Sequence, residues 1–228
     1  MFKSYVAVLA VTAAFAPAVC AATEADKRLD AAADLLTDMM QAKDKGIPQE
    51  LLNRSQCVIL VPGLKKAALG FGGKFGRGFA MCRHASGSGW SAPAAIRVEG
   101  GSVGFQIGIS EQDVLLLVTN ESGMKRLLAD KFTVGAEATA AAGPVGRDAS
   151  AQTDAVMRAE MLSYSRSRGL FAGVSLQGAT MRPDADANEE LYGKKLENKE
   201  ILTGDIQAPA GAAKLETLLN RNSSRKSK

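Results

Sequence analysis

The first residues to test for chemistry are Gly73-Lys74, because a glycine-rich loop ending in lysine binds phosphate in nucleotide-binding proteins. The Walker pattern also needs a glycine at position 68 and a serine or threonine at position 75, where this sequence has Ala68 and Phe75. A dinucleotide fingerprint that starts at Gly70 fails as well, because its third glycine would fall on Phe75. We therefore exclude both nucleotide-binding motifs.

Nucleophilic catalysis is the second chemistry to test. His84 is the only histidine, and the glycines and serines of Arg83–Gly89 around it predict a hairpin loop at the surface. A serine hydrolase needs a histidine base close to its serine, and Gly89–Pro93 breaks the Gly-x-Ser-x-Gly pattern at its last position. The sequence therefore favours a binding protein over an enzyme.

Metal chemistry has one candidate, a group of acidic and amide residues near the C-terminal end: Asp184, Asp186, Asn188, Glu189 and Glu190. A calcium loop needs a glycine for its sharp turn, and this group has none. The pattern instead predicts a solvated helix start, where acidic side chains are favoured by the helix dipole. We expect neither a metal nor a cofactor.

The first 22 residues predict a secretory signal peptide. Lys3 supplies a positive charge, Val6–Val19 is apolar and alanine-rich, and small residues follow at positions 20–22. Cys20 suggests lipidation as an alternative, but Pro17 and Val19 occupy positions where a bacterial lipoprotein signal has other residues, so we favour ordinary cleavage. The sequence thus predicts that the mature protein is periplasmic or secreted. Association with the outer membrane is one form of this prediction.

Composition narrows the class of partner. The formal net charge of +4 is mild and aromatic residues make up only 5%, so the sequence argues against a nucleic-acid partner. Cys57 and Cys82 remain after cleavage, each in an apolar run. An exported protein can join them in a disulfide, but we favour two buried free thiols.

The fold must be built from an N-terminal helix and unusual glycine-rich strands. Helical spacing over residues 23–43 places apolar side chains on one face: Leu29, Ala32, Ala33, Leu36, Met39 and Met40. From Leu69 to Cys82, large apolar residues alternate with small ones, so a whole face of the strand is glycine or alanine. Such a face indicates close approach of another backbone or strong curvature.

We predict an α+β fold: a mainly antiparallel, curved or barrel-like sheet with helices packed outside and an N-terminal amphipathic helix. Further predicted elements are a short helix from residue 47, a strand at 57–61, a strand at 114–118, a helix at 122–130, a strand within 132–143 and a short helix within 184–196. Residues 23–220 are expected to form a single domain, and residues 221–228 a disordered basic tail.

Six blocks of sequence, in order, resemble the SYLF domain family. They are GWSAPAAI at 89–96, GFQIG at 104–108, AAGPVGR at 141–147, SYSRSRGLFAGVSLQG at 163–178, NEELYG at 188–193 and KEILTG at 199–204. The resemblance extends from about Asp26 to Leu219. It identifies the chain as an exported bacterial member of this family.

The resemblance implies a function. Eukaryotic SYLF proteins bind membranes that contain phosphoinositides, some fungal members bind and bundle actin, and bacterial relatives are described as lipid-binding. It therefore implies a non-catalytic peripheral protein that binds phosphatidylinositol or another anionic phospholipid at a membrane surface. The alternative is a protein-interaction or actin-binding scaffold with a protein or filament partner.

In this family, membrane contact is attributed to a basic amphipathic helix at the N-terminal end of the domain. The matching residues here are Lys27, Arg28, Leu29, Leu36, Met39 and Met40. Residues 23–45 hold six carboxylates against four basic residues, which disfavours docking on anionic lipid. Two interpretations stay open, insertion of the apolar face into lipid and packing of that face on the domain, and we favour packing.

Two other basic groups are candidates for contact with lipid head groups. Each cation would contribute about 1 kcal/mol near an anionic surface. The same side chains can instead pair with acidic neighbours or backbone carbonyls. The candidates are Arg166 and Arg168 in one group, and Lys65, Lys66, Lys74 and Arg77 in the other.

Overall fold

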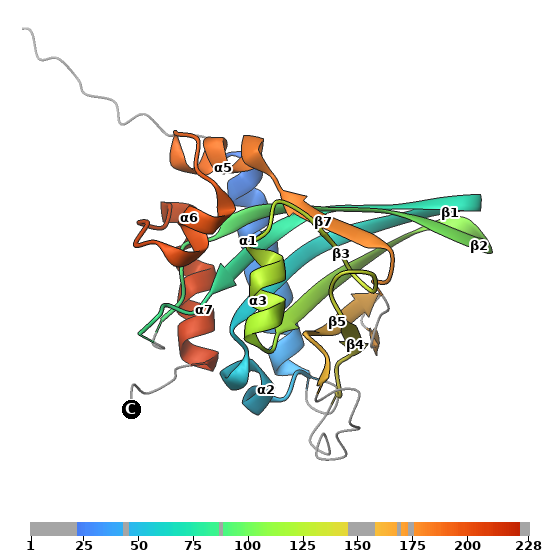
Figure 1. Cartoon of the computed structure of the whole chain (residues 1–228), viewed down its shortest axis with the longest axis horizontal. Helices are drawn as coiled ribbons and strands as arrows, with labels where there is room; N and C mark the ends of the chain where they lie inside the picture. Colours follow the sequence, from blue (N-terminus) through green and yellow to red (C-terminus); the bar gives the residue numbers. More distant parts are fainter. Residues whose placement is uncertain are drawn as a thin grey trace, which may run out of the picture.

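The computed structural model describes residues 22–42, 46–86, 89–145, 158–167, 170–172 and 176–223. It confirms the predicted α+β class, with a curled, mainly antiparallel sheet and helices packed against it (Figure 1). Most of the predicted signal peptide lies outside the described residues, as does the last part of the predicted basic tail. No helix in the described part of the chain is long and apolar enough to cross a membrane.

Helix α1 (Glu24–Gln41) confirms the N-terminal helix. Thr23 caps it, because its hydroxyl accepts a hydrogen bond from the Asp26 N–H while the Asp26 carboxylate accepts one from the Thr23 N–H. The apolar face predicted from the spacing is the buried face of the helix. It packs against β1 and against the C-terminal helix α7 (Ala213–Asn222).

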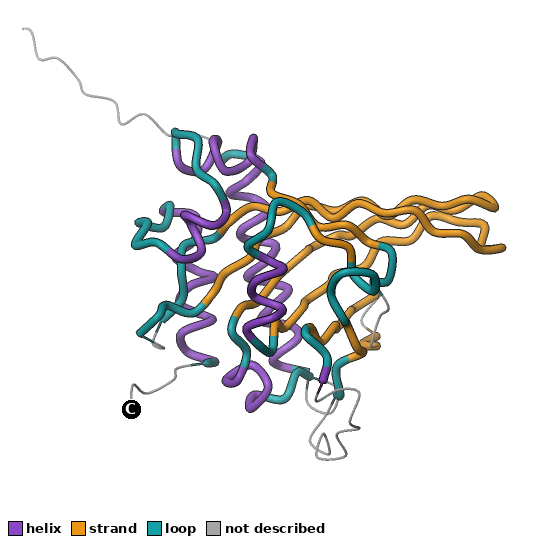
Figure 2. Tube along the Cα trace, in the orientation of Figure 1, coloured by secondary structure: helices purple, strands orange, loops and turns teal. Residues whose placement is uncertain are grey.

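Strands β1 (Cys57–Cys82) and β2 (Ala94–Val118) form a long antiparallel ribbon that projects beyond the helices (Figure 2). A straight strand of 26 residues would span roughly 85 Å. The Cα atoms of Cys57 and Cys82 are nevertheless only 4.0 Å apart, so the ribbon doubles back on itself. The fold-over coincides with the break in register between Leu69 and Phe71.

The glycine-rich face allows the two halves of β1 to approach closely. A Cβ atom built on Gly78 would lie 2.0 Å from the Leu60 carbonyl oxygen, and one on Gly76 would lie 2.8 Å from the Val61 side chain. No side chain fits in this space. The predicted close backbone approach is therefore confirmed at Gly78, whereas Gly76 makes room for side chains of the other half of β1.

The expectation of two free thiols is wrong. Cys57 and Cys82 form a disulfide that joins the first and last residues of β1. Both cysteines are buried in apolar runs, as the sequence indicated. The spacing along the chain could not show that the ribbon folds over and brings its two ends together.

Five shorter strands complete a seven-stranded sheet among the described residues. They are β3 (Phe132–Thr133), β4 (Ala140–Ala142), β5 (Met161–Ser167), β6 (Leu170–Ala172) and β7 (Ala179–Pro183). Strand β5 pairs with the end of β2, and β7 pairs with its beginning. The strand predicted within 132–143 is thus two short strands, which pair with β7 and β5 respectively.

The remaining helices pack around this sheet. They are α2 (Gln49–Arg54), α3 (Glu121–Leu127), α5 (Ala185–Tyr192) and α6 (Asn198–Thr203), with a 3-10 turn at Ala210–Ala212 before α7. Helix α7 continues to Asn222 and Ser223 is buried, so the tail does not begin at residue 221 as predicted. Residues 224–228 lie outside the described residues.

Alternation along β1 and β2 creates two apolar cores, one on each face of the sheet. Leu60 and Leu115 face the core that contains α1 and α7, whereas Ile59 and Leu116 face the core that contains α6. Arg83, at the base of the ribbon, closes the first core. Its guanidinium donates to the carbonyls of Leu52, Ser55 and Ser223 and stacks on the Trp90 ring.

Candidate interaction surface

The projecting ribbon holds the most exposed large apolar side chains of the described residues. Ile109 on β2 is 84% exposed and Phe75 on β1 is 49% exposed. Phe75 belongs to the same alternating face as Phe79, which is fully buried. Phe75 lies in register with Glu99 and Phe79 with Ala95, so the face passes from solvent to core within four residues of β1.

Three lysines lie on the same ribbon. Lys65 is exposed and pairs in register with Glu111, while Lys66 and Lys74 are half-buried. Burial lowers the pKa of Lys66 and of Lys74, and the Lys74 charge lowers the pKa of Lys66 further. We call Lys65, Lys66, Lys74, Phe75 and Ile109 the arm surface, a set drawn from both faces of the ribbon, because successive side chains of a strand point to opposite faces. It combines cations with apolar side chains, as the contact surface of a binding protein does.

Arg77, the fourth predicted member of this basic group, is used differently. Its Nε lies 3.2 Å from the Asp184 Oδ2, and Arg97 Nη2 lies 2.8 Å from the Asp184 Oδ1. Arg97 also pairs with Asp186 at 2.7 Å. Asp184 is completely buried, so the arginines neutralise a carboxylate inside the fold. Arg77 is therefore a structural residue and stands apart from the arm surface.

The predicted solvated helix start is correct only in part. Asp186 is exposed, but Asp184 caps α5 from a buried position. Asn188 is also buried, and its Oδ1 accepts a hydrogen bond from the Ala95 N–H at 2.8 Å. Both buried residues connect α5 to the beginning of β2.

Arg166 makes two ion pairs, with Asp38 of α1 and with Asp113 of β2. The distance from its Nη2 to the Asp113 Oδ2 is 3.2 Å. The structure thus gives Arg166 the structural role that the sequence left as an alternative to head-group contact. Arg168 lies outside the described residues.

The structure places the predicted residues of α1 in two groups. Leu29, Leu36 and Met39 are fully buried and Met40 packs against the same core, so the packing interpretation holds for this face. In this fold the side chains of Leu29, Leu36 and Met39 have no exposed surface, whereas Met40 is partly exposed. Lys27 is exposed and pairs with Glu24 at 2.6 Å.

Arg28, the remaining basic residue of α1, is half-buried. Burial lowers its pKa, the nearby Arg77 lowers it further, and Asp184, Glu190 and Glu24 oppose the change. Arg28 therefore belongs to the cluster of charges around Asp184.

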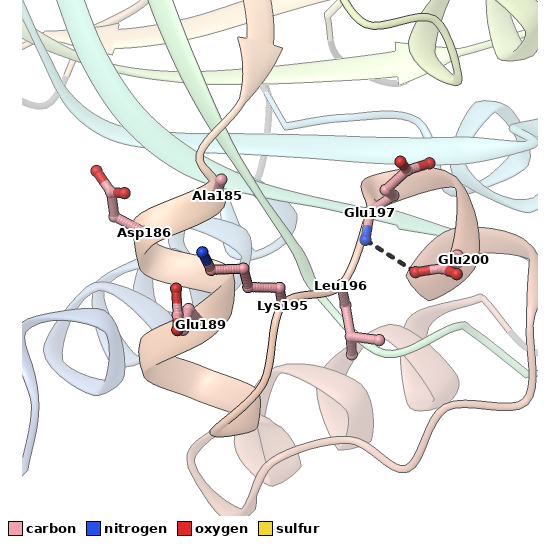
Figure 3. A pocket seen from close by; sticks show the side chains of 7 residues that line it. All are labelled: Ala185, Asp186, Glu189, Lys195, Leu196, Glu197 and Glu200. Carbon is pink, nitrogen blue, oxygen red and sulfur yellow. Dashed lines mark hydrogen bonds between the residues drawn. The ribbon is translucent and has the colours of Figure 1, made fainter.

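A pocket of about 470 Å³ lies between α5 and α6 (Figure 3). Asp186 and Glu189 line it from α5, and Glu197 and Glu200 line it at the start of α6. The last two form a capping box, in which the Glu197 N–H donates to the Glu200 carboxylate at 3.0 Å. Helix capping therefore accounts for the acidic residues of α6, and the pocket needs no ligand to explain them.

Nowhere among the described residues do three or more histidine, cysteine or carboxylate side chains gather as metal ligands would. His84 lies in the short loop between β1 and β2, next to Gly89, as predicted for a surface hairpin. The arrangement offers surfaces for binding, and Asp184, the one fully buried carboxylate among the described residues, is held in ion pairs.

Sequence reasoning did not select Ile109 as a site residue. The signal available was an apolar residue flanked by Gly108 and Ser110 in a strand of small residues. That pattern does not distinguish a buried position from an exposed one.

Comparison with known proteins identifies what the chain is similar to. Residues 99–222 match a family described as Ysc84, Las17-binding protein actin regulator. The chain is 36% identical over 177 residues to an SH3 domain-containing protein of Schizosaccharomyces pombe, an alignment that covers 76% of this chain and 41% of the relative. It is 32% identical over 179 residues to Protein YSC84 of Saccharomyces cerevisiae, covering 77% of this chain and 38% of the relative.

A mammalian relative gives the same result. The chain is 31% identical over 178 residues to SH3 domain-containing YSC84-like protein 1 of Rattus norvegicus, covering 78% of this chain and 52% of the relative. The chain thus spans between about two fifths and half of the length of these curated relatives. The family description refers to binding and regulation, and two of these relatives carry the name YSC84.

Proposed function

Because the chain belongs to the Ysc84 family, the SYLF family of the sequence analysis, we propose that it is a non-catalytic module that binds a partner protein. The observation that carries this proposal is the family match over 99–222, since that family is described by its binding of Las17 and its regulation of actin. The match includes most of β2, and therefore Ile109 of the arm surface.

The geometry supports a binding role. The arm surface projects from a body that is held by two cores, a disulfide and buried ion pairs, so it is presented on a rigid support. Exposed apolar side chains next to cations provide both contact area and orientation for a protein partner. We assign the partner contact to this surface.

Co-sedimentation of the chain with actin filaments, and a binding titration with purified Las17, test the proposal. The variant Lys65→Glu/Lys66→Glu reverses the charge of the arm surface, and Lys125→Glu changes an exposed lysine on α3 as a matched control. Saturable binding that is weakened only by the arm variant is the expected result. If both variants still bind, the partner contacts another surface of the chain. If the chain binds neither actin filaments nor Las17, the proposed function is overturned.

Lipid binding is a second candidate, favoured by one observation. Ile109 is 84% exposed on a projecting ribbon that also carries three lysines, and such a combination inserts an apolar side chain while cations meet anionic head groups. The test is co-sedimentation with vesicles of neutral and of anionic lipid, at low and physiological salt. Binding to anionic vesicles only, fading with salt, supports it, and binding to neither kind rules it out.

Export is part of the proposal. A disulfide persists in oxidising compartments and is rare in the cytosol, so the Cys57–Cys82 bond supports a periplasmic or secreted location. Fractionation of cells that express the full chain tests this location. Recovery in the cytosol with both thiols reduced would contradict it.

A further inference from the structure

Strand β2 is paired unequally on its two sides. On one side it pairs with β1 along most of its length. On the other side it pairs with β7 only over Ile96–Gly100 and with β5 only over Asp113–Val118. Between these two segments, residues 101–112 have a second edge that no other strand of the described chain occupies.

The C-terminal half of this edge is open to solvent. Gly108, Ile109, Ser110 and Glu111 are all exposed, and the ribbon that carries them extends beyond the helices (Figures 1 and 2). The nearest strand neighbour is the end of β5, where the Ser167 hydroxyl donates to the Glu111 carbonyl at 3.4 Å. An open edge with an exposed β-branched residue is a template for pairing with another strand.

We propose that this edge pairs antiparallel with the same edge of a second copy of the chain, with Ile109 opposite Ile109. This inference goes beyond the proposed function, because it concerns self-association. Two identical edges related by a two-fold axis satisfy each other's backbone N–H and C=O groups and close the interface, so a dimer forms in place of a filament.

The residues along the edge suit this register. With Ile109 at the two-fold axis, Gly108 lies opposite Ser110, and Glu111 lies opposite residue 107 of the other copy. The two Glu111 carboxylates are thereby kept apart, and like charges do not face each other across the new pair. Ile109, 84% exposed in the single chain, then gains an apolar partner.

The size of the contact sets its strength. A pair of strands of about five residues each, with one isoleucine pair, buries less than the roughly 800 Å² per partner of a stable complex. The dimer is therefore weak and depends on protein concentration.

Sedimentation velocity of the full chain, at concentrations from about 1 µM to about 1 mM, measures this equilibrium. We expect a monomer that becomes a dimer as concentration rises. Ile109→Lys places two charges at the axis and raises the dimer Kd by roughly tenfold or more, whereas Ile109→Val preserves the pair. Phe75→Lys is the matched control, because it removes an exposed apolar residue of the same ribbon that lies off this edge. Circular dichroism checks that each variant is folded.

Three outcomes would overturn the inference. They are a monomer at every concentration, a dimer that Ile109→Lys leaves intact, and a dimer that Phe75→Lys weakens as much as Ile109→Lys does. A monomer whose Ile109→Lys variant loses vesicle binding would assign Ile109 to lipid contact. None of these results depends on actin or Las17, so failure of the inference and failure of the proposed function are distinguishable.

Discussion

Arg97 Nη2 lies 2.8 Å from the Oδ1 of Asp184, whose carboxylate is completely buried. The Nε of Arg77 lies 3.2 Å from the Oδ2 of the same carboxylate. Asp184 begins α5, Arg97 lies on β2 and Arg77 lies on β1. One buried carboxylate thus connects both strands of the ribbon to the helix that follows β7.

Replacing this carboxylate removes the ion pair of Arg77 with Asp184 and leaves Arg97 paired with the exposed Asp186 alone. We expect Asp184→Ala to lower the free energy of unfolding by about 3 kcal/mol, since breaking a buried pair strands the opposite charges and α5 also loses its cap. Asp186→Ala is the control, because Asp186 pairs with the same Arg97 from an 85% exposed position. Its expected effect is within about 0.5 kcal/mol. Urea denaturation measures both, and equal effects would contradict the structural role of Asp184.

The disulfide at the base of the ribbon closes a segment of the chain with a sequence separation of 25 residues. Because it limits the freedom of the unfolded chain, we expect Cys57→Ala/Cys82→Ala to lose about 3 kcal/mol of stability. A reducing agent should lower the melting temperature of the parent chain and leave that of the double variant unchanged. A parent chain that is indifferent to reduction would show that the bond contributes little.

Gly78 lies where the ribbon crosses itself. We expect Gly78→Ala to destabilise the fold by at least about 2 kcal/mol, because its Cβ would lie 2.0 Å from the Leu60 carbonyl oxygen and the backbone must move. At Gly73 the nearest atom to a new Cβ is 4.0 Å away, so Gly73→Ala is the matched control. Thermal unfolding of the two variants compares them. Similar melting temperatures would mean that the crossing adapts easily.

Glu160 gives the fold a dependence on pH. Burial raises the pKa of its carboxyl, but hydrogen bonds from Ser122 and Thr139 outweigh burial and hold the pKa below its ordinary value of 4.5. Folding therefore stabilises the ionised form. This contribution is fully present above pH 4.5 and is lost as the pH falls through the folded-state pKa.

We therefore expect Glu160→Gln to lower the melting temperature at neutral pH, and the difference from the parent chain to shrink at about pH 3. Glu121→Gln, an exposed residue at the start of α3, is the control and should show no such change with pH. A difference that stays constant between the two pH values would exclude the carboxylate charge as the cause.

The local sequence predicted the elements whose cause is local. Thr23 with Asp26 and the apolar spacing beyond them predict α1, and the spacing also selects the face that the structure buries. The glycine face of β1 predicts close backbone contact, which Gly78 confirms. These predictions succeed because caps, periodicity and steric space depend on residues close together in the sequence.

How deeply a side chain is buried, and which charged partner it meets, depend on residues that are far apart in the sequence. Phe75 and Phe79 share one alternating face, yet the first is 49% exposed and the second is buried, a difference that the alternation does not show. Arg166 looked like a candidate for head-group contact, but Asp38 and Asp113 lie beside it once α1 and β2 are in place.

The sequence by itself thus determined the α+β class, the N-terminal helix and the glycine-lined strand, since each follows from local steric and periodic constraints. Only the tertiary structure decided that Cys57 meets Cys82, that Asp184 is buried between two arginines and that Ile109 stands at an open edge. The physical reason is the fold-over of the β1–β2 ribbon. It brings residues more than twenty positions apart into contact, and no local pattern specifies where they meet.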